Sequence, residues 1–201
     1  MLIFPTLRMQ ILAAVSLVLP LLAEPALAQS HIRGTLAGVK DDTITVQTLK
    51  GGNEDIKLAG DVAFFLVTKS DMKAVQPGKF VGITSVERGG KRVAVEVHVF
   101  AETLRGLGEG HYPWDLDSTP NMMTNANIAK LEAVGTDRVL KLSYSGGEQT
   151  ISVPETATIV EFDKAGHDQL VPGRRVFVGM KKDAKEAAFV VIGAEGVKPP
   201  M

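Results

Sequence analysis

Residues 92–99 read RVAVEVHV, with valine at every odd-numbered position. Successive side chains of a strand point to opposite faces of the sheet, and valine at that spacing favours a half-buried strand. Residues 42–48 also alternate polar and apolar side chains, and they stop at a Lys50–Asn53 segment that contains two glycines. Glycine adopts the positive backbone angles that a hairpin needs. The two stretches predict a β protein built from hairpins.

The residues between these stretches carry the same short pattern. Period two returns over residues 55–58, an apolar run covers 62–67, and 69–75 predicts one helical turn. The segment Gln76-Pro77-Gly78 then turns the chain into a strand at 80–83. Roughly five short strands in about 70 residues cannot bury an apolar face as a flat sheet, so the unit should curl into a small barrel.

A constant offset of 95 residues aligns the chain with itself and predicts two copies of this unit, Ile32–Phe100 and Ile128–Glu195. The aligned positions are turn glycines and apolar strand residues: Gly51-Gly52 with Gly146-Gly147, Pro77-Gly78 with Pro172-Gly173, Val81 and Ile83 with Val176 and Val178, and Val95 and Val97 with Val190 and Ile192. We therefore expect residues 1–28 to be a signal peptide, 29–100 a first β-barrel repeat, 101–127 a connector, and 128–201 a second β-barrel repeat.

These turn and core motifs resemble the DUF5666 family of exported bacterial proteins. The resemblance rests on Gly38-Val39, Gly51-Gly52, Pro77-Gly78 and Ala94–Val97, and again on Val134-Gly135, Gly146-Gly147, Pro172-Gly173 and Ala188–Ile192. It implies small OB-like barrels and export, and it supplies no catalytic residue. The expected fold class is all-β, with two tandem small OB-like β-barrels joined by an ordered connector.

The first residues predict export. Arg8 supplies a positive flank, an apolar run spans Ile11–Leu22, and Ala26-Leu27-Ala28 forms an A-x-A cleavage site. The apolar run is short for a membrane span, which needs roughly 20 residues, and it contains Pro20. We expect a mature chain that begins at Gln29, is soluble, has no membrane span, and lies in a bacterial periplasm.

Composition excludes several classes of function. The chain has no cysteine, which removes disulfides, thiolate nucleophiles and Cys-ligated metal sites. Its net charge is −1, so no chain-wide cationic field is available for a nucleic acid. We expect no nucleic-acid partner.

The connector has no counterpart elsewhere in the chain, and it holds the only tryptophan. Exposing such a large aromatic forgoes about 2 kcal/mol of burial, so we expect Tyr112, Pro113 and Trp114 to pack on a barrel. Four acidic side chains and one basic side chain also concentrate negative charge in this segment. The predicted ligand-binding residues are Arg105, Glu109, His111, Trp114 and Asp115.

A divalent-metal site is the alternative for the same segment. His111 with Glu109 and Asp115 offers an imidazole and hard oxygen donors, which suit Zn, Mn or Ni. His98 lies two residues from Glu96 on one strand face and would add a second imidazole. The predicted metal ligands are therefore His111, Glu109, Asp115 and His98, and no other cofactor is predicted.

The chain lacks the common catalytic signatures, including G-x-S-x-G and H-E-x-x-H. We expect an exported, non-enzymatic binding or interaction protein with its site at the connector and a periplasmic protein or small ligand as partner. The alternative is a periplasmic divalent-metal-binding protein. A third hypothesis, a hydrolase that uses a carboxylate pair such as Glu102 and Glu109, lacks a defined separation of the two acids.

Overall fold

The computed structural model describes residues 30–182 and 185–199, and this part of the chain is nearly all β, with no α-helix. The predicted signal peptide and cleavage site lie outside the described residues. The strands are β1 (His31–Lys40), β2 (Thr43–Thr48), β3 (Asn53–Lys69), β4 (Phe80–Arg88), β5 (Lys91–Phe100), β6 (Gly110–Trp114), β7 (Asn121–Val134), β8 (Asp137–Tyr144), β9 (Gly147–Val153), β10 (Thr158–Ala165), β11 (Arg175–Met180) and β12 (Glu186–Gly193). Two short 3-10 turns are η1 (Glu102–Leu104) and η2 (His167–Gln169).

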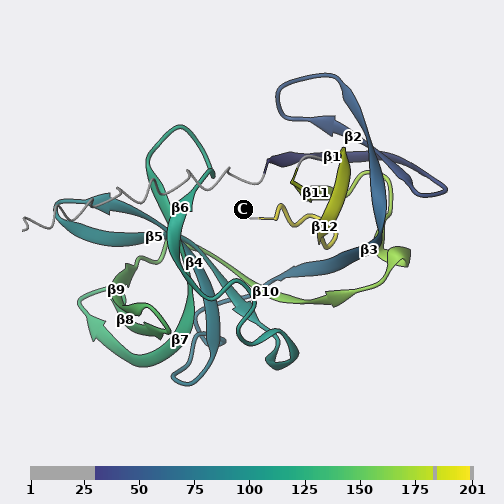
Figure 1. The fold of residues 1–201 in the computed structure, drawn as a ribbon. Coiled ribbons are helices and arrows are strands. Elements are labelled where there is room, and N and C mark those ends of the chain that lie inside the picture. Colours follow the sequence, from purple (N-terminus) through teal and green to yellow (C-terminus); the bar gives the residue numbers. More distant parts are fainter. Residues whose placement is uncertain (1–29, 183–184, 200–201) are drawn as a thin grey trace, which may run out of the picture.

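Five strands form a closed barrel, here called ring one. β1 pairs with β2 and β11, β2 pairs with β3, and β11 pairs with β12, all antiparallel. A parallel pairing of β12 with β3 closes the ring. Figure 1 shows these strands together in the right-hand lobe of the molecule.

Five other strands form a second arrangement, here called ring two. β4 pairs with β5 and β7, and β8 pairs with β7 and β9, again all antiparallel. Only a two-residue parallel contact of β5 with β9, Arg92 opposite Ile151 and Val93 opposite Ser152, completes the circuit. These strands occupy the left-hand lobe in Figure 1.

The predicted tandem order of two barrels is not confirmed, because each ring contains strands from both predicted repeats. Ring one combines β1–β3 with β11 and β12, whereas ring two combines β7–β9 with β4 and β5. β4 and β11 begin at Phe80 and Arg175, and β5 and β12 begin at Lys91 and Glu186, so both pairs are separated by the predicted offset of 95 residues. The last two strands of the first predicted repeat, β4 and β5, therefore lie in ring two with β7–β9. The last two strands of the second predicted repeat, β11 and β12, lie in ring one with β1–β3.

β3 connects ring one to the strands that lead to ring two. We expected separate runs at 55–58 and 62–67, but β3 is one strand of 17 residues. Residues 53–57 pair with β2, and residues 63–67 pair in parallel with β12, so nearly the whole length of β3 lies in the wall of ring one. Its second half pairs antiparallel with β10, which in turn pairs with β5. Figure 1 shows β3 and β10 running between the two lobes.

Three apolar clusters correspond to this architecture. One fills ring one, with Leu36, Ile44 and Val178 fully buried, and another fills ring two, with Ile83 and Leu140 fully buried. The third cluster joins the rings and is rich in phenylalanine: Phe65, Phe80, Phe100, Phe162 and Phe177. β5 has the third cluster on one face and the core of ring two on the other. From Glu96 to Phe100 it is therefore buried on both faces, rather than half-buried as the sequence predicted.

The connector belongs to the sheet. It begins with η1, and β6 then pairs antiparallel with the first part of β7. β7 begins at Asn121, within the segment assigned to the connector by sequence. Among the described residues, no helix is long and apolar enough to cross a membrane.

Candidate functional site

An open groove lies where the connector meets β3 and β10, the paired strands that run between the two lobes. It is here called the connector groove. Its volume is about 500 Å³. β3 contributes one wall, β10 a second, and the start of the connector a third. The lining residues are Val62, Ala63, Phe64, Phe65, Thr103, Leu104, Arg105, Leu107, Lys164 and Ala165.

Arg105 holds the connector wall in place. Its guanidinium forms an ion pair with Glu102, donates to Asn127 of β7, and donates to the carbonyl oxygen of Gly78 at 2.9 Å. The hydrogen bond from Arg105 holds the pKa of the Glu102 carboxyl below its usual range. Arg105, which the sequence predicted as a ligand contact, thus lines the groove while its donors are engaged by the protein itself.

Two leucines shape the connector wall. Leu104 is buried in the phenylalanine cluster between the rings, so it anchors η1. Leu107 leaves 41% of its surface exposed, and its carbonyl oxygen accepts a hydrogen bond from Asn125 at 3.1 Å. The fixed backbone at Leu107 therefore presents an apolar side chain to solvent at the groove.

Trp114 and Asp115 lie away from the groove, at the junction of β6 with ring one. The indole contacts His31 of β1 and Phe177 of β11, with ring centroids 4.8 and 6.0 Å apart. Asp115 accepts a hydrogen bond from Arg33 at 2.8 Å and lies 3.0 Å from Nδ1 of His31. These contacts clamp the connector to ring one. His31 takes part in the clamp, although the sequence assigned it no role.

A buried indole N–H needs a hydrogen-bond acceptor, and from the sequence the candidates for Trp114 are the adjacent Asp115 and a barrel carbonyl. This expectation is wrong: Nε1 of Trp114 is buried and has no hydrogen-bond partner among the described residues. The carboxylate of Asp115 is instead directed at His31 and Arg33. The indole is therefore held by aromatic and apolar contacts, while the backbone of Trp114 pairs with Asn121 of β7.

Both titratable partners in this clamp have shifted pKa values. Burial lowers the pKa of His31 below its usual value; Asp115 opposes this shift and Arg33 adds to it. Burial alone would raise the pKa of Asp115, but hydrogen bonds and charges from Arg33 and His31 lower it. The clamp therefore favours neutral imidazole beside an ionised carboxylate.

We expect the melting temperature to fall as the pH is lowered from about 7.5 to about 5. The unfolded chain protonates His31 near its ordinary pKa of 6.5, whereas the folded chain protonates it only at lower pH. The unfolded state therefore binds more protons in this window, and acid destabilises the fold. The measurement is a series of thermal melts of the native chain and of His31→Gln, which should lose part of the dependence. A native melting temperature that stays constant or rises on acidification contradicts the prediction.

The remaining predicted ligand residues each have a partner within the protein. Glu109 accepts a hydrogen bond from the backbone N–H of Ser145 at 2.9 Å. Nδ1 of His111 lies 2.8 Å from the hydroxyl of Thr124, and its ring stacks on Tyr144. Burial lowers the pKa of His111. Neither side chain lines the connector groove.

His98 and His111 lie on opposite faces of the sheet. Strand register aligns His111 with Thr124, Thr124 with Ile83, and Ile83 with Val97, so His111 shares a face with Val97 and not with its neighbour His98. Within the described part of the chain, no group of three or more His, Asp or Glu side chains could hold a metal ion. The four predicted metal ligands therefore do not converge.

His98 instead belongs to a buried polar cluster on the face of ring two that contacts the phenylalanines. Its Nε2 lies 3.3 Å from Oε1 of Glu96, and both side chains are almost fully buried. The hydroxyl of Thr84 donates to the same Glu96 oxygen at 2.7 Å. The sequence correctly placed Glu96 and His98 on one strand face, and the structure shows that this face points into the protein.

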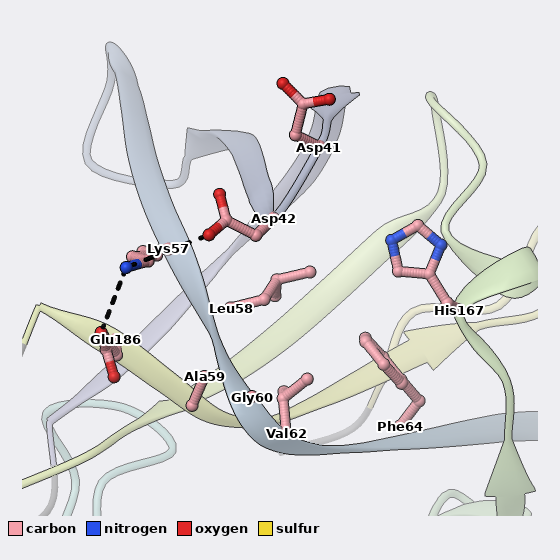
Figure 2. A pocket seen from close by; sticks show the side chains of 10 residues that line it. All are labelled: Asp41, Asp42, Lys57, Leu58, Ala59, Gly60, Val62, Phe64, His167 and Glu186. Atoms are coloured by element: carbon pink, nitrogen blue, oxygen red, sulfur yellow. Dashed lines mark ion pairs between the residues drawn. The ribbon is translucent and has the colours of Figure 1, made fainter.

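A second hollow, of about 520 Å³, lies on the ring-one side of Val62 and Phe64 (Figure 2). Figure 2 shows Asp41, Asp42, Lys57 and Glu186 on one side and His167 on the other. Nζ of Lys57 lies 4.0 Å from Asp42 and 3.8 Å from Glu186. Sequence reasoning did not find this acidic hollow, although the adjacent Asp41 and Asp42 in a turn were a visible signal.

Sequence reasoning also missed most of the connector groove. It assigned no ligand role to Lys164 or to the β3 residues, because they meet the connector only through the pairing of β3 with β10. The two adjacent phenylalanines, Phe64 and Phe65, were the available signal. One of them packs toward the ring-one cluster and the other into the cluster between the rings.

Comparison of the chain with protein-family models, with curated proteins and with solved structures finds no match. The resemblance to the DUF5666 family stays a prediction from the turn and core motifs.

Proposed function

We propose that the protein is an exported, non-enzymatic binding module, and that a small ligand binds in the connector groove. The observation that carries this proposal is the groove itself: mostly apolar, about 500 Å³ in volume, and lined by three separate segments of the chain. Pockets for small molecules are concave, mainly apolar and in this range of size. The anchoring of Leu104 and Arg105 means that the connector wall is already formed before a ligand arrives.

We further propose that the two rings are OB-like barrels made from a duplicated unit. In support, strands follow the order β1-β2-β3-β12-β11 around ring one and β7-β8-β9-β5-β4 around ring two, with a parallel closing pair in each. Small barrels of this kind commonly bind ligands through one face and its loops. Export and a periplasmic location rest on Arg8, the apolar run and the A-x-A site, together with the DUF5666 resemblance.

A titration with decanol, a neutral alkyl probe, tests the binding function. We expect the methyl NMR signals of Leu104 and Leu107 to shift and to saturate, because the alkyl chain replaces water against these side chains. Leu107→Asp should weaken binding at least tenfold, or about 1.4 kcal/mol, because a charge then occupies the apolar wall.

The matched control is Leu49→Asp, which places the same charge at another exposed leucine, in the turn between β2 and β3. Its affinity for decanol should equal that of the native chain. The proposed function is contradicted if Leu104 and Leu107 show no saturable shift, or if Leu107→Asp and Leu49→Asp bind decanol equally well.

A further inference from the structure

The connector groove and the acidic hollow carry opposite charge. Among the described residues, ten line the connector groove, and Arg105 and Lys164 are its only charged members. The acidic hollow on the other side of Val62 and Phe64 has three carboxylates and one lysine. Charged ligands would therefore distinguish the two hollows, and the connector groove favours an anion.

Lys164 is the cation that the groove offers to a ligand. The charge of Arg105 is matched by Glu102, whose carboxylate it binds at two points. Lys164 has no ion-pair partner among residues 30–182 and 185–199, and it lies opposite Phe65 in the pairing of β10 with β3. A lysine beside an aromatic side chain can keep its stem on the apolar surface and its ammonium in water.

We propose that the connector groove binds an alkyl carboxylate, with its hydrocarbon chain against Phe64, Leu104 and Leu107 and its carboxylate at Lys164. This proposal rests on the proposed function and adds the class of ligand. The groove volume suits a small amphiphile, and the combination of an apolar lining with one unmatched cation suits a single negative charge at one end of an apolar chain. No bond is formed or broken.

The test compares three probes of equal chain length: decanoate and decyltrimethylammonium, each used below its critical micelle concentration, and decanol, used below its solubility limit. Dissociation constants are measured by following the Leu104 and Leu107 methyl signals at about pH 7.5, where the carboxylate is ionised and lysine is protonated. We expect decanoate to bind about tenfold more tightly than decanol, and the cationic probe to bind most weakly. Added salt should reduce the advantage of decanoate because the pair is exposed to solvent.

Substitution of Lys164 isolates its contribution. Lys164→Gln should remove the preference for decanoate while leaving the affinity for decanol unchanged, and Lys164→Glu should make the cationic probe the tighter ligand. Lys50→Gln, at an exposed lysine in the turn between β2 and β3, is the matched control and should retain the native preference.

The outcomes separate this inference from the proposed function. Equal binding of decanoate and decanol, with no effect of Lys164→Gln, overturns the assignment of an anionic ligand and leaves the binding function standing. If none of the three probes shifts Leu104 or Leu107, the proposed function fails and the ligand class fails with it.

Discussion

The double variant Thr35→Cys/Arg175→Cys is expected to form a disulfide within one chain in nearly every molecule. Thr35 of β1 lies opposite Arg175 of β11, and the Arg175 guanidinium already reaches the Thr35 hydroxyl at 3.3 Å. Directly opposed residues of antiparallel strands have the spacing that a disulfide requires. The chain has no other cysteine to compete. In the chain-entropy model, closing a loop of more than about 100 residues stabilises the fold by roughly 4–5 kcal/mol.

This cross-link tests the exchange of strands between the rings. Peptide mapping under oxidising conditions should find the bond between the two introduced cysteines in monomeric protein, and the melting temperature should fall on reduction. In two tandem barrels, β1 would pair with the strand that begins at Phe80, so Thr35→Cys/Phe80→Cys is the matched alternative. A cross-link in that variant and none in the first would refute the exchanged arrangement.

Replacing Glu96 by Leu is expected to destabilise the protein by roughly 3–5 kcal/mol. Glu96 and His98 are 2% and 1% exposed, and the carboxylate accepts the hydrogen bond of the equally buried Thr84. The substitution removes the acceptor of Thr84 and the acid facing His98, in a region that water does not reach. A buried polar group that loses its hydrogen-bond partner destabilises the folded state, because neither water nor protein replaces that partner.

The double variant Glu96→Leu/His98→Leu tests whether the loss in Glu96→Leu comes from leaving His98 without its acidic partner. Replacing both members by apolar side chains often restores stability, so we expect the double variant to be clearly more stable than Glu96→Leu. The measurement is chemical denaturation of the native chain, both single variants and the double variant, analysed as a double-mutant cycle. Additive losses would mean that Glu96 and His98 do not act as a pair.

Local structure was predictable because it depends on neighbouring residues. The alternation in residues 42–48 and 92–99 identified β2 and β5, and the positive φ of Gly51, Gly52, Gly78 and Gly173 agrees with the predicted turns. The exchange of strands was not predictable in the same way. β4 and β11 have matching apolar patterns, so the pattern of either strand fits either ring, and the sequence of the strand does not say which ring it joins.

The same distinction between local patterns and contacts of distant segments applies to the candidate site. The sequence singled out the connector, and Arg105 of the connector lines the groove. The other predicted ligand residues instead hold the connector to the rings: Glu109, His111, Trp114 and Asp115. Lys164 and Phe65 face each other although they lie far apart in the sequence, a contact that no local pattern reveals. The predicted metal set mixed residues from two sheet faces because the register of β6 could not be read from sequence.

The exchange of strands also sets an order in which the chain can fold as it emerges from the ribosome or a translocon. All strands of ring two have been made once Val153 has emerged, but ring one, which contains the first strand, needs β12 and so waits until Gly193. During that interval both edges of its β1–β3 sheet are unpaired, because β1 awaits β11 and β3 awaits β10 and β12. Pairings between such distant segments slow folding and prolong exposure of strand edges to aggregation. The amino-terminal third of the chain is therefore the part that we expect to keep unpaired strand edges longest during synthesis.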